Sequence, residues 1–196
     1  PNTEYLSDGM TESLMNILSQ LSNLTVMSRS SVFHYKGREI DPHKAGKELG
    51  VKAVLTGRVT QRGDNLQIST ELMEVENNSH IWGEQYNRKL SDIFTIQEEI
   101  SKEISHQLRL KLVGEDEKTL TKRSTESTEA YQLYLKGRFH WNKRKADDLQ
   151  KAVDYFNQAI EKDPGYALAY AGLASTYSLL PEYSGKPSRD FIPKAE

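Results

Sequence analysis

Apolar and polar positions alternate through the middle of the chain, as is typical of a half-buried antiparallel sheet. The first alternating run covers residues 51–60, and a turn at residues 62–65 separates it from a second run. One set of alternating positions in the two runs is Val51, Ala53, Leu55, Gly57, Val59, Leu66, Ile68, Thr70 and Leu72. A turn at residues 76–79 precedes a third predicted strand, residues 80–86. We therefore predict a three-stranded antiparallel meander.

Apolar residues recur every three or four positions on both sides of this sheet, which predicts amphipathic helices. The first such pattern runs over residues 10–21, and Asp8 is its expected N-cap. The second runs over residues 91–112 and carries isoleucines on one stripe. We expect that stripe to cover one face of the sheet.

Shorter signals lie between the first helix and the sheet. Asp41-Pro42 is a helix start, with a capping carboxylate before a proline at the first helical position, and Leu49-Gly50 is a helix stop. Residues 24–28 are predicted to form a short buried strand. Residues 30–37 are ambiguous and are interpreted as a helical turn.

The last third of the chain has the pattern of antiparallel helices. One helix is predicted over residues 130–141, followed by a loop at residues 144–147. The next two helices are interrupted by Asp163-Pro164-Gly165, because proline disfavours a helical conformation at the residue before it. The residues that define their packing faces are Ala152, Phe156, Ala159, Tyr170, Leu173, Ala174 and Tyr177.

This spacing resembles the joint between two tetratricopeptide (TPR) repeats, which pair helices with a 34-residue period. The resemblance implies an all-α helical-hairpin segment over residues 130–196, about one and a half repeats long and truncated. It also implies a groove that binds a protein or peptide partner. If Gly137 takes the small-residue position of the first repeat, then Tyr134, Arg138 and Trp141 line that groove and Ser175 extends it.

The first part of the chain resembles the amino-terminal domain of the TolB translocation protein. The resemblance rests on residues 5–12, 47–51 and 80–88 and covers residues 4–112. It implies an α/β (α+β) fold with a mixed, largely antiparallel sheet packed by helices. In that family the module precedes TPR repeats and often follows an adenylate/guanylate cyclase, a Ser/Thr kinase or a winged-helix regulator. The family's first strand would lie before Pro1, so one sheet edge is expected to be unpaired.

These signals predict a domain over residues 1–113, a linker over residues 114–129 and the helical segment over residues 130–196. The chain begins at Pro1 without an initiator methionine, so we expect an excised fragment. It has no cysteine and no apolar run long enough for a membrane span. Cytoplasm is favoured, and the periplasm remains open. The net charge of −2 gives no general attraction to nucleic acid.

Motifs for catalysis are not found. The spacing of the glycines excludes the dinucleotide and P-loop phosphate motifs, and the five histidines are scattered. His80 and Glu84 could share one face of a strand, but we interpret them as ordinary polar strand residues. We expect no catalytic residue, metal or cofactor in this chain.

A basic cluster is the strongest candidate for ligand chemistry. Lys136, Lys143, Arg144 and Lys145 lie in a window, residues 130–146, that has no acidic residue. Such a cluster fits an anionic peptide or phosphate, or it solvates an outer helix face; nucleic acid is the weaker alternative.

We expect a non-catalytic regulatory segment of a larger bacterial signalling or transcription-regulatory protein, which binds a partner through the TPR groove. The alternative is a sensor of a nucleotide or another small signal that controls an attached cyclase or kinase. Self-association through the truncated helical face or the unpaired sheet edge is a further expectation.

Overall fold

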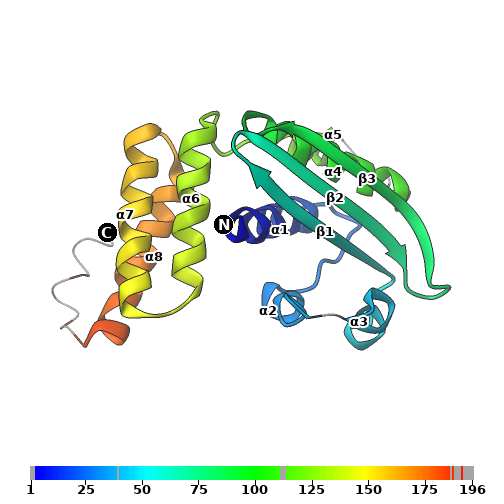
Figure 1. The fold of residues 1–196 in the computed structure, drawn as a ribbon, viewed down its shortest axis with the longest axis horizontal. Helices are drawn as coiled ribbons and strands as arrows, with labels where there is room; N and C mark the ends of the chain where they lie inside the picture. The colour runs from blue at the N-terminus through cyan, green and yellow to red at the C-terminus, as the bar shows by residue number, and fades with distance from the viewer. Residues whose placement is uncertain (1–2, 39, 111–113, 186, 188–190, 192–196) are drawn as a thin grey trace. The chain divides into compact units, whose positions relative to one another are not determined.

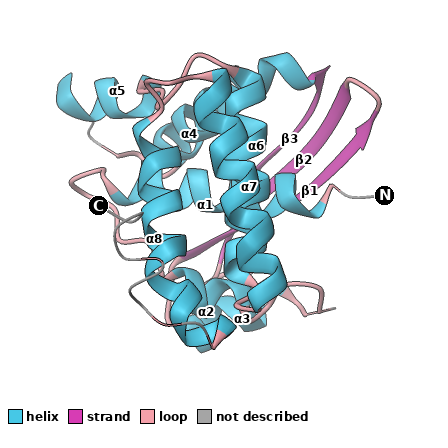
Figure 2. Cartoon of the chain, turned by 90° about the vertical axis from the view of Figure 1, so that its left-hand side faces the viewer, coloured by secondary structure: helices cyan, strands magenta, loops and turns pink. Residues whose placement is uncertain are grey.

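The computed structural model describes residues 3–38, 40–110, 114–185, 187 and 191. Contacts divide the chain into two compact units: Met10–Lys122 forms an α/β unit, and Pro1–Gly9 with Arg123–Glu196 forms a helical unit. The elements are α1 (Glu4–Ser19), α2 (Arg29–Phe33), α3 (Pro42–Leu49), β1 (Ala53–Arg62), β2 (Asn65–Glu74), β3 (Ser79–Lys89), a 3-10 turn (Leu90–Asp92), α4 (Ile93–Gln107), α5 (Gly114–Thr121), α6 (Thr128–Asn142), α7 (Ala146–Lys162) and α8 (Ala167–Ser184) (Figures 1 and 2).

The predicted meander is confirmed. The strand order is β1-β2-β3, and both pairings are antiparallel. In register, Ile68 stands opposite Val59 on one side and Tyr86 on the other. Along β2, Leu66, Ile68, Thr70 and Leu72 are buried while the residues between them are exposed. One face of the sheet therefore belongs to the core and the other to solvent.

Helix α4 buries its isoleucine stripe, as expected, and it contacts β3. Ile93, Ile96, Ile100 and Ile104 are almost completely buried. A polar stripe on the same helix, Gln97, Ser101 and Ser105, is also buried. The Ser13 hydroxyl on α1 donates to Gln97 Oε1 at 3.5 Å, which shows that α1 lies beside α4. The core of this unit thus fills the space between the sheet and these two helices.

The start and stop signals of α3 are confirmed. The Asp41 carboxylate accepts a hydrogen bond from the His43 backbone N–H at 3.0 Å, which satisfies one of the free donors at the helix start. Gly50 closes the helix with φ 66°, a left-handed conformation that glycine adopts without steric cost. The ambiguous segment after residue 29 is the single turn α2.

Three predictions about residues 1–113 are wrong. Residues 24–28 form no strand; the described strands pair only among themselves, and Leu24 and Val26 are only half-buried. Asp8 lies inside α1, because the helix begins one turn earlier, where two backbone N–H groups bond to the Thr3 carbonyl. Helix α4 ends near Gln107, where Arg109 turns to φ 51°; residues 111 and 112 of the predicted helix lie outside the described residues.

The helical unit contains the predicted succession of helices, and the break at Asp163-Pro164-Gly165 separates α7 from α8. Phe156 of α7 is completely buried between the other two helices. Gly137 of α6 and Gly172 of α8 each lie so close to its ring that a Cβ built there would stand 2.6 and 2.7 Å from a ring carbon. The absence of side chains at these two glycines lets three helices meet around one phenylalanine.

The segment assigned to a linker has structure of its own. It contains α5, whose Leu120 is buried, and it also contains Thr125, which is 6% exposed. The Thr125 hydroxyl donates to the Asp163 carboxylate, which in turn accepts from the Gly165 N–H in the α7–α8 turn. The chain entering α6 is therefore tied to the turn at the far end of α7.

Candidate functional site

The candidate site lies on α6 and α8, where the sequence predicted a binding groove. Tyr134 is half-buried, and its ring centroid lies 5.8 Å from Phe156 and 5.2 Å from Tyr166. The second contact reaches the residue just before α8. The Tyr134 ring therefore packs between α7 and the start of α8. Only the exposed part of its side chain can contact a partner.

Trp141 also packs inside the unit. Its indole lies against a buried cluster of Leu149, Val153 and Leu180, which Leu173 and Tyr177 extend. The indole Nε1 is buried and has no hydrogen-bond acceptor among the described residues. Trp141 thus contributes to the core and leaves a polar donor unsatisfied, which usually costs free energy.

Two arginines gather on this indole. The guanidinium carbon of Arg138 lies 4.8 Å from the Trp141 ring centroid, and that of Arg144 lies 3.7 Å from it. Such cation–π contacts stabilise by about 0.5–1 kcal/mol at exposed sites. We call Arg138, Trp141 and Arg144 the cation–indole cluster. It combines part of the predicted groove with part of the predicted basic cluster.

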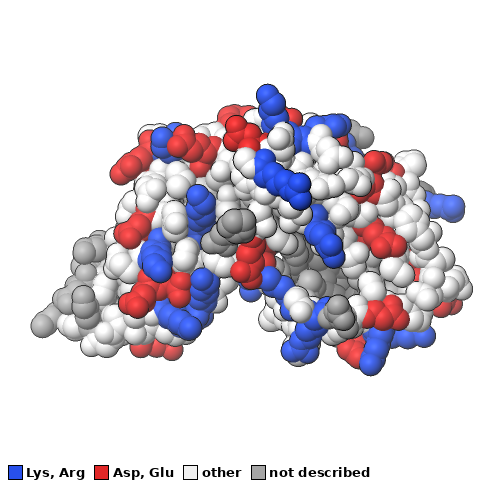
Figure 3. Space-filling view, in the orientation of Figure 1, with Lys and Arg blue, Asp and Glu red and all other residues white. Residues whose placement is uncertain are grey.

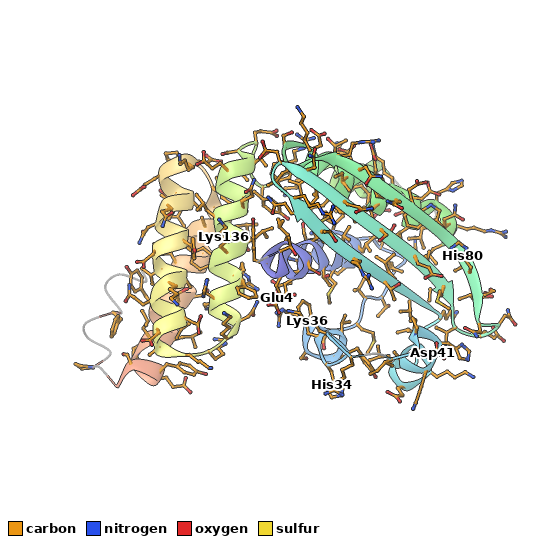
Figure 4. The ribbon with its side chains drawn as sticks, in the orientation of Figure 1. Glu4, His34, Lys36, Asp41, His80 and Lys136 are labelled. Carbon is orange, nitrogen blue, oxygen red and sulfur yellow. The ribbon has the colours of Figure 1, made fainter. Side chains whose placement is uncertain are left out.

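The remaining basic residues are Lys136 on α6 and, in the connection to α7, Lys143 and Lys145. Lys136 lies 5.3 Å from the Tyr5 ring centroid and 5.8 Å from that of Tyr155 (Figure 4). The Lys143 Nζ lies 3.5 Å from the Asp148 carboxylate and 4.4 Å from the Phe139 ring centroid. Lys145 is exposed. Lys136 and Lys143 therefore both contact α7, and acidic side chains are interspersed with basic ones on the face drawn in Figure 3.

A histidine–carboxylate pair joins α6 and α7, and the sequence analysis did not predict it. The Nδ1 atom of His140 lies 2.7 Å from an Asp148 oxygen, and its ring stacks on Tyr155 at 5.4 Å. The hydrogen bond with His140 holds the pKa of Asp148 below its usual range, with a further contribution from Lys143. The spacing of eight residues across a loop gave no signal, since only the folded hairpin brings the two groups together.

Helix α8 presents an uncharged surface. Leu168, Ala171, Ser175 and Ser178 recur at helical spacing, are all exposed, and are named here the α8 stripe. Glu182 is the single charged residue within the 18 residues of this helix. Tyr170, which was predicted on a packing face, is 47% exposed. The predicted groove residue Ser175 therefore lies on an accessible helix surface of small and apolar side chains.

His80 and Glu84 do not form an acid/base pair. A β-bulge between Leu72 and Met73 shifts the register of β3, so that His80 stands opposite Met73 and Glu84 opposite Thr70, on different faces of the sheet. Burial raises the pKa of the neighbouring Tyr86 hydroxyl to about 12. Among the described residues, no three His, Asp or Glu side chains come together as a metal site.

Comparison with models of known protein families gives no match. Among curated proteins, the chain is similar to a protein of Rhizobium meliloti (strain 1021) named "Putative adenylate cyclase 3". The two are 35% identical over 174 residues, which is 89% of this chain and 30% of the relative. The chain thus spans less than a third of the length of the protein it matches. No helix in the described part of the chain is long and apolar enough to cross a bilayer.

Proposed function

We propose that this chain is a non-catalytic regulatory segment of a larger protein with a nucleotide cyclase as its effector, and that it binds a protein partner through α6 and α8. The match with the cyclase-named relative supports the first part of the proposal. At 174 residues it is longer than either compact unit, so it includes residues from both. The two units are therefore retained together within a much longer protein.

The arrangement of the helical unit supports the second part. Helices α6, α7 and α8 follow one another with short connections, and Phe156 is enclosed by glycines of the first and third helices. This agrees with the TPR resemblance, in which alternate helices line the binding surface. The single observation that carries the proposal is that the α8 stripe is exposed and uncharged, while α6 carries Arg138 and Trp141. Arginine and tryptophan often contribute most of the binding energy at protein interfaces.

The test is made in the longer protein. Ser175→Arg and Leu168→Glu place charge on exposed positions of the α8 stripe, so folding should be preserved. Asn157→Glu, at an exposed position on α7, is the matched control. We expect the two α8 substitutions to abolish capture of a partner from the native host and to change regulated production of cyclic AMP, while the control changes neither. Unchanged capture by all three variants would refute binding through α8.

A small-ligand sensor in the α/β unit is the second candidate. The observation that favours it is the Ser101 hydroxyl, which is completely buried on α4 and has no partner among the described residues. A polar ligand would satisfy it. In a thermal-shift screen with nucleotides, this candidate predicts stabilisation that is lost in Ser101→Ala and kept in Ser175→Arg. A screen in which no nucleotide raises the melting temperature would count against it.

A further inference from the structure

The carboxyl-terminal end of α6 gathers positive charge on one aromatic ring. Two guanidinium groups lie over the Trp141 indole, whose buried N–H has no acceptor among the described residues. Within the same part of the chain, the Arg144 guanidinium has no carboxylate partner. A guanidinium held flat on an aromatic ring keeps its N–H edge available for a carboxylate, which it can bind through two hydrogen bonds.

The backbone at Arg144 gives an independent indication. Arg144 has φ 53°, directly after the C-cap of α6, in the left-handed region. Glycine is the usual residue there, because a side chain costs about 1 kcal/mol or more in that conformation. The chain has arginine at a position where glycine would be more stable. Backbone strain of this kind is concentrated at binding sites.

The α8 stripe limits what else the partner contains. Its exposed side chains are two serines, an alanine and Leu168, none of which offers a charge. Helix α8 lies beside α6 at the end that carries the cation–indole cluster, because Trp141 packs against the same buried cluster as Tyr177 and Leu179 of α8. A partner segment that lies along this surface meets small uncharged residues on α8 and arginines at the end of α6.

We propose that α6 and α8 bind a peptide segment whose carboxylate side chains contact the cation–indole cluster and whose small or apolar residues lie on the α8 stripe. This inference rests on the proposed function, because it names the chemistry of the partner at the same surface. Arg138 and Arg144 supply the charge, and Trp141 fixes their positions.

Fluorescence anisotropy with the 196-residue chain tests this proposal. The probes are two fluorescein-labelled peptides of alternating alanine and leucine, one ending in a pair of glutamates and the other in a pair of glutamines. We expect the glutamate peptide to bind at least about tenfold more tightly, because hydrogen bonds to charged groups are among the stronger ones. Equal binding of both peptides would refute the preference for an acidic partner. It would not refute the proposed function, which the capture experiment tests separately.

Two variants locate the contact. Arg144→Gly should reduce the affinity for the glutamate peptide about tenfold and leave the thermal midpoint unchanged or higher, since it removes a strained side chain. Lys151→Ala removes an exposed cation of α7 and should change the affinity less than about twofold. Equal losses in both variants would indicate attraction to overall charge and refute the assignment. Binding of the glutamate peptide that survives Ser175→Arg would refute the part of the proposal that concerns α8.

Discussion

Replacing Gly172 by alanine probes the contact that joins the three helices. The added Cβ would stand 2.7 Å from two ring carbons of Phe156, closer than carbon atoms pack in proteins. Phe156 is completely buried, and Gly137 of α6 lies close to the same ring carbons, so the ring cannot move without disturbing its packing. We therefore expect Gly172→Ala to destabilise the helical unit.

Two opposing effects set the magnitude. Forcing a methyl group into a packed core costs about 1–3 kcal/mol. Alanine in a helix interior is more favourable than glycine by about 1 kcal/mol, which offsets part of that cost. The net loss should be about 1 kcal/mol. Ala171→Gly, at the exposed neighbouring position, measures the helix-propensity term by itself and should also cost about 1 kcal/mol.

Urea unfolding followed by tryptophan fluorescence can report on this unit alone. The chain has two tryptophans, Trp82 in β3 and Trp141 in α6. In a Trp82→Phe background, the signal comes from Trp141, which packs on the cluster of Leu149 and Leu180. The free energies of unfolding of Gly172→Ala and Ala171→Gly are then compared directly.

The double variant Gly172→Ala, Phe156→Leu decides whether the ring is responsible. A smaller side chain at residue 156 leaves space for the new methyl group. In the Phe156→Leu background, Gly172→Ala should therefore be neutral or stabilising. A coupling of about 1 kcal/mol or more between the two sites is the expected result. If Gly172→Ala stabilises the unit by the amount that Ala171→Gly destabilises it, the close approach to Phe156 has no energetic effect and the reasoning is wrong.

Three further predictions concern caps and charges. Asp148→Asn should destabilise the helical unit at neutral pH. Because the pKa of Asp148 is lowered by His140, the difference from the native chain should disappear as pH falls through that lowered pKa, in urea melts at successive pH values. Asp41→Ala removes the cap of α3 and should lower the free energy of unfolding of the α/β unit by about 1 kcal/mol, measured by Trp82 fluorescence. Asp41→Ser should recover most of this loss. Gly50→Ala should cost about 1 kcal/mol in the same assay, since its φ of 66° strains any side chain although no atom lies near the new Cβ.

The elements with strong local signals were predicted well. Alternation located the three strands, and the cap at Asp41 with the glycine at residue 50 bounded α3. Period alone could not place the ends of longer helices: α1 begins a turn before Asp8, and α4 ends where Arg109 leaves the helical conformation. Helix ends depend on hydrogen bonds of individual residues, which periodicity does not encode.

The candidate site was predicted less completely, because it depends on side chains from several helices. Spacing on α6 brought Arg138 and Trp141 onto one stripe, and the structure adds Arg144 to the same indole. The pairing of His140 with Asp148 and the contact of Gly172 with Phe156 both cross a loop, so nothing in the local sequence indicated them. Such contacts become visible only when the packing of the helices is known.

The hydrogen bond between Thr125 and Asp163 has a mechanical consequence. Tension applied to the chain at residue 123 reaches the α7–α8 turn directly through this side-chain bond, without first passing along α6. Asp163 also accepts a hydrogen bond from the Gly165 N–H just before α8, so the applied force reaches the amino-terminal end of that helix. A movement of the preceding polypeptide would therefore be transmitted to α8 in a single step.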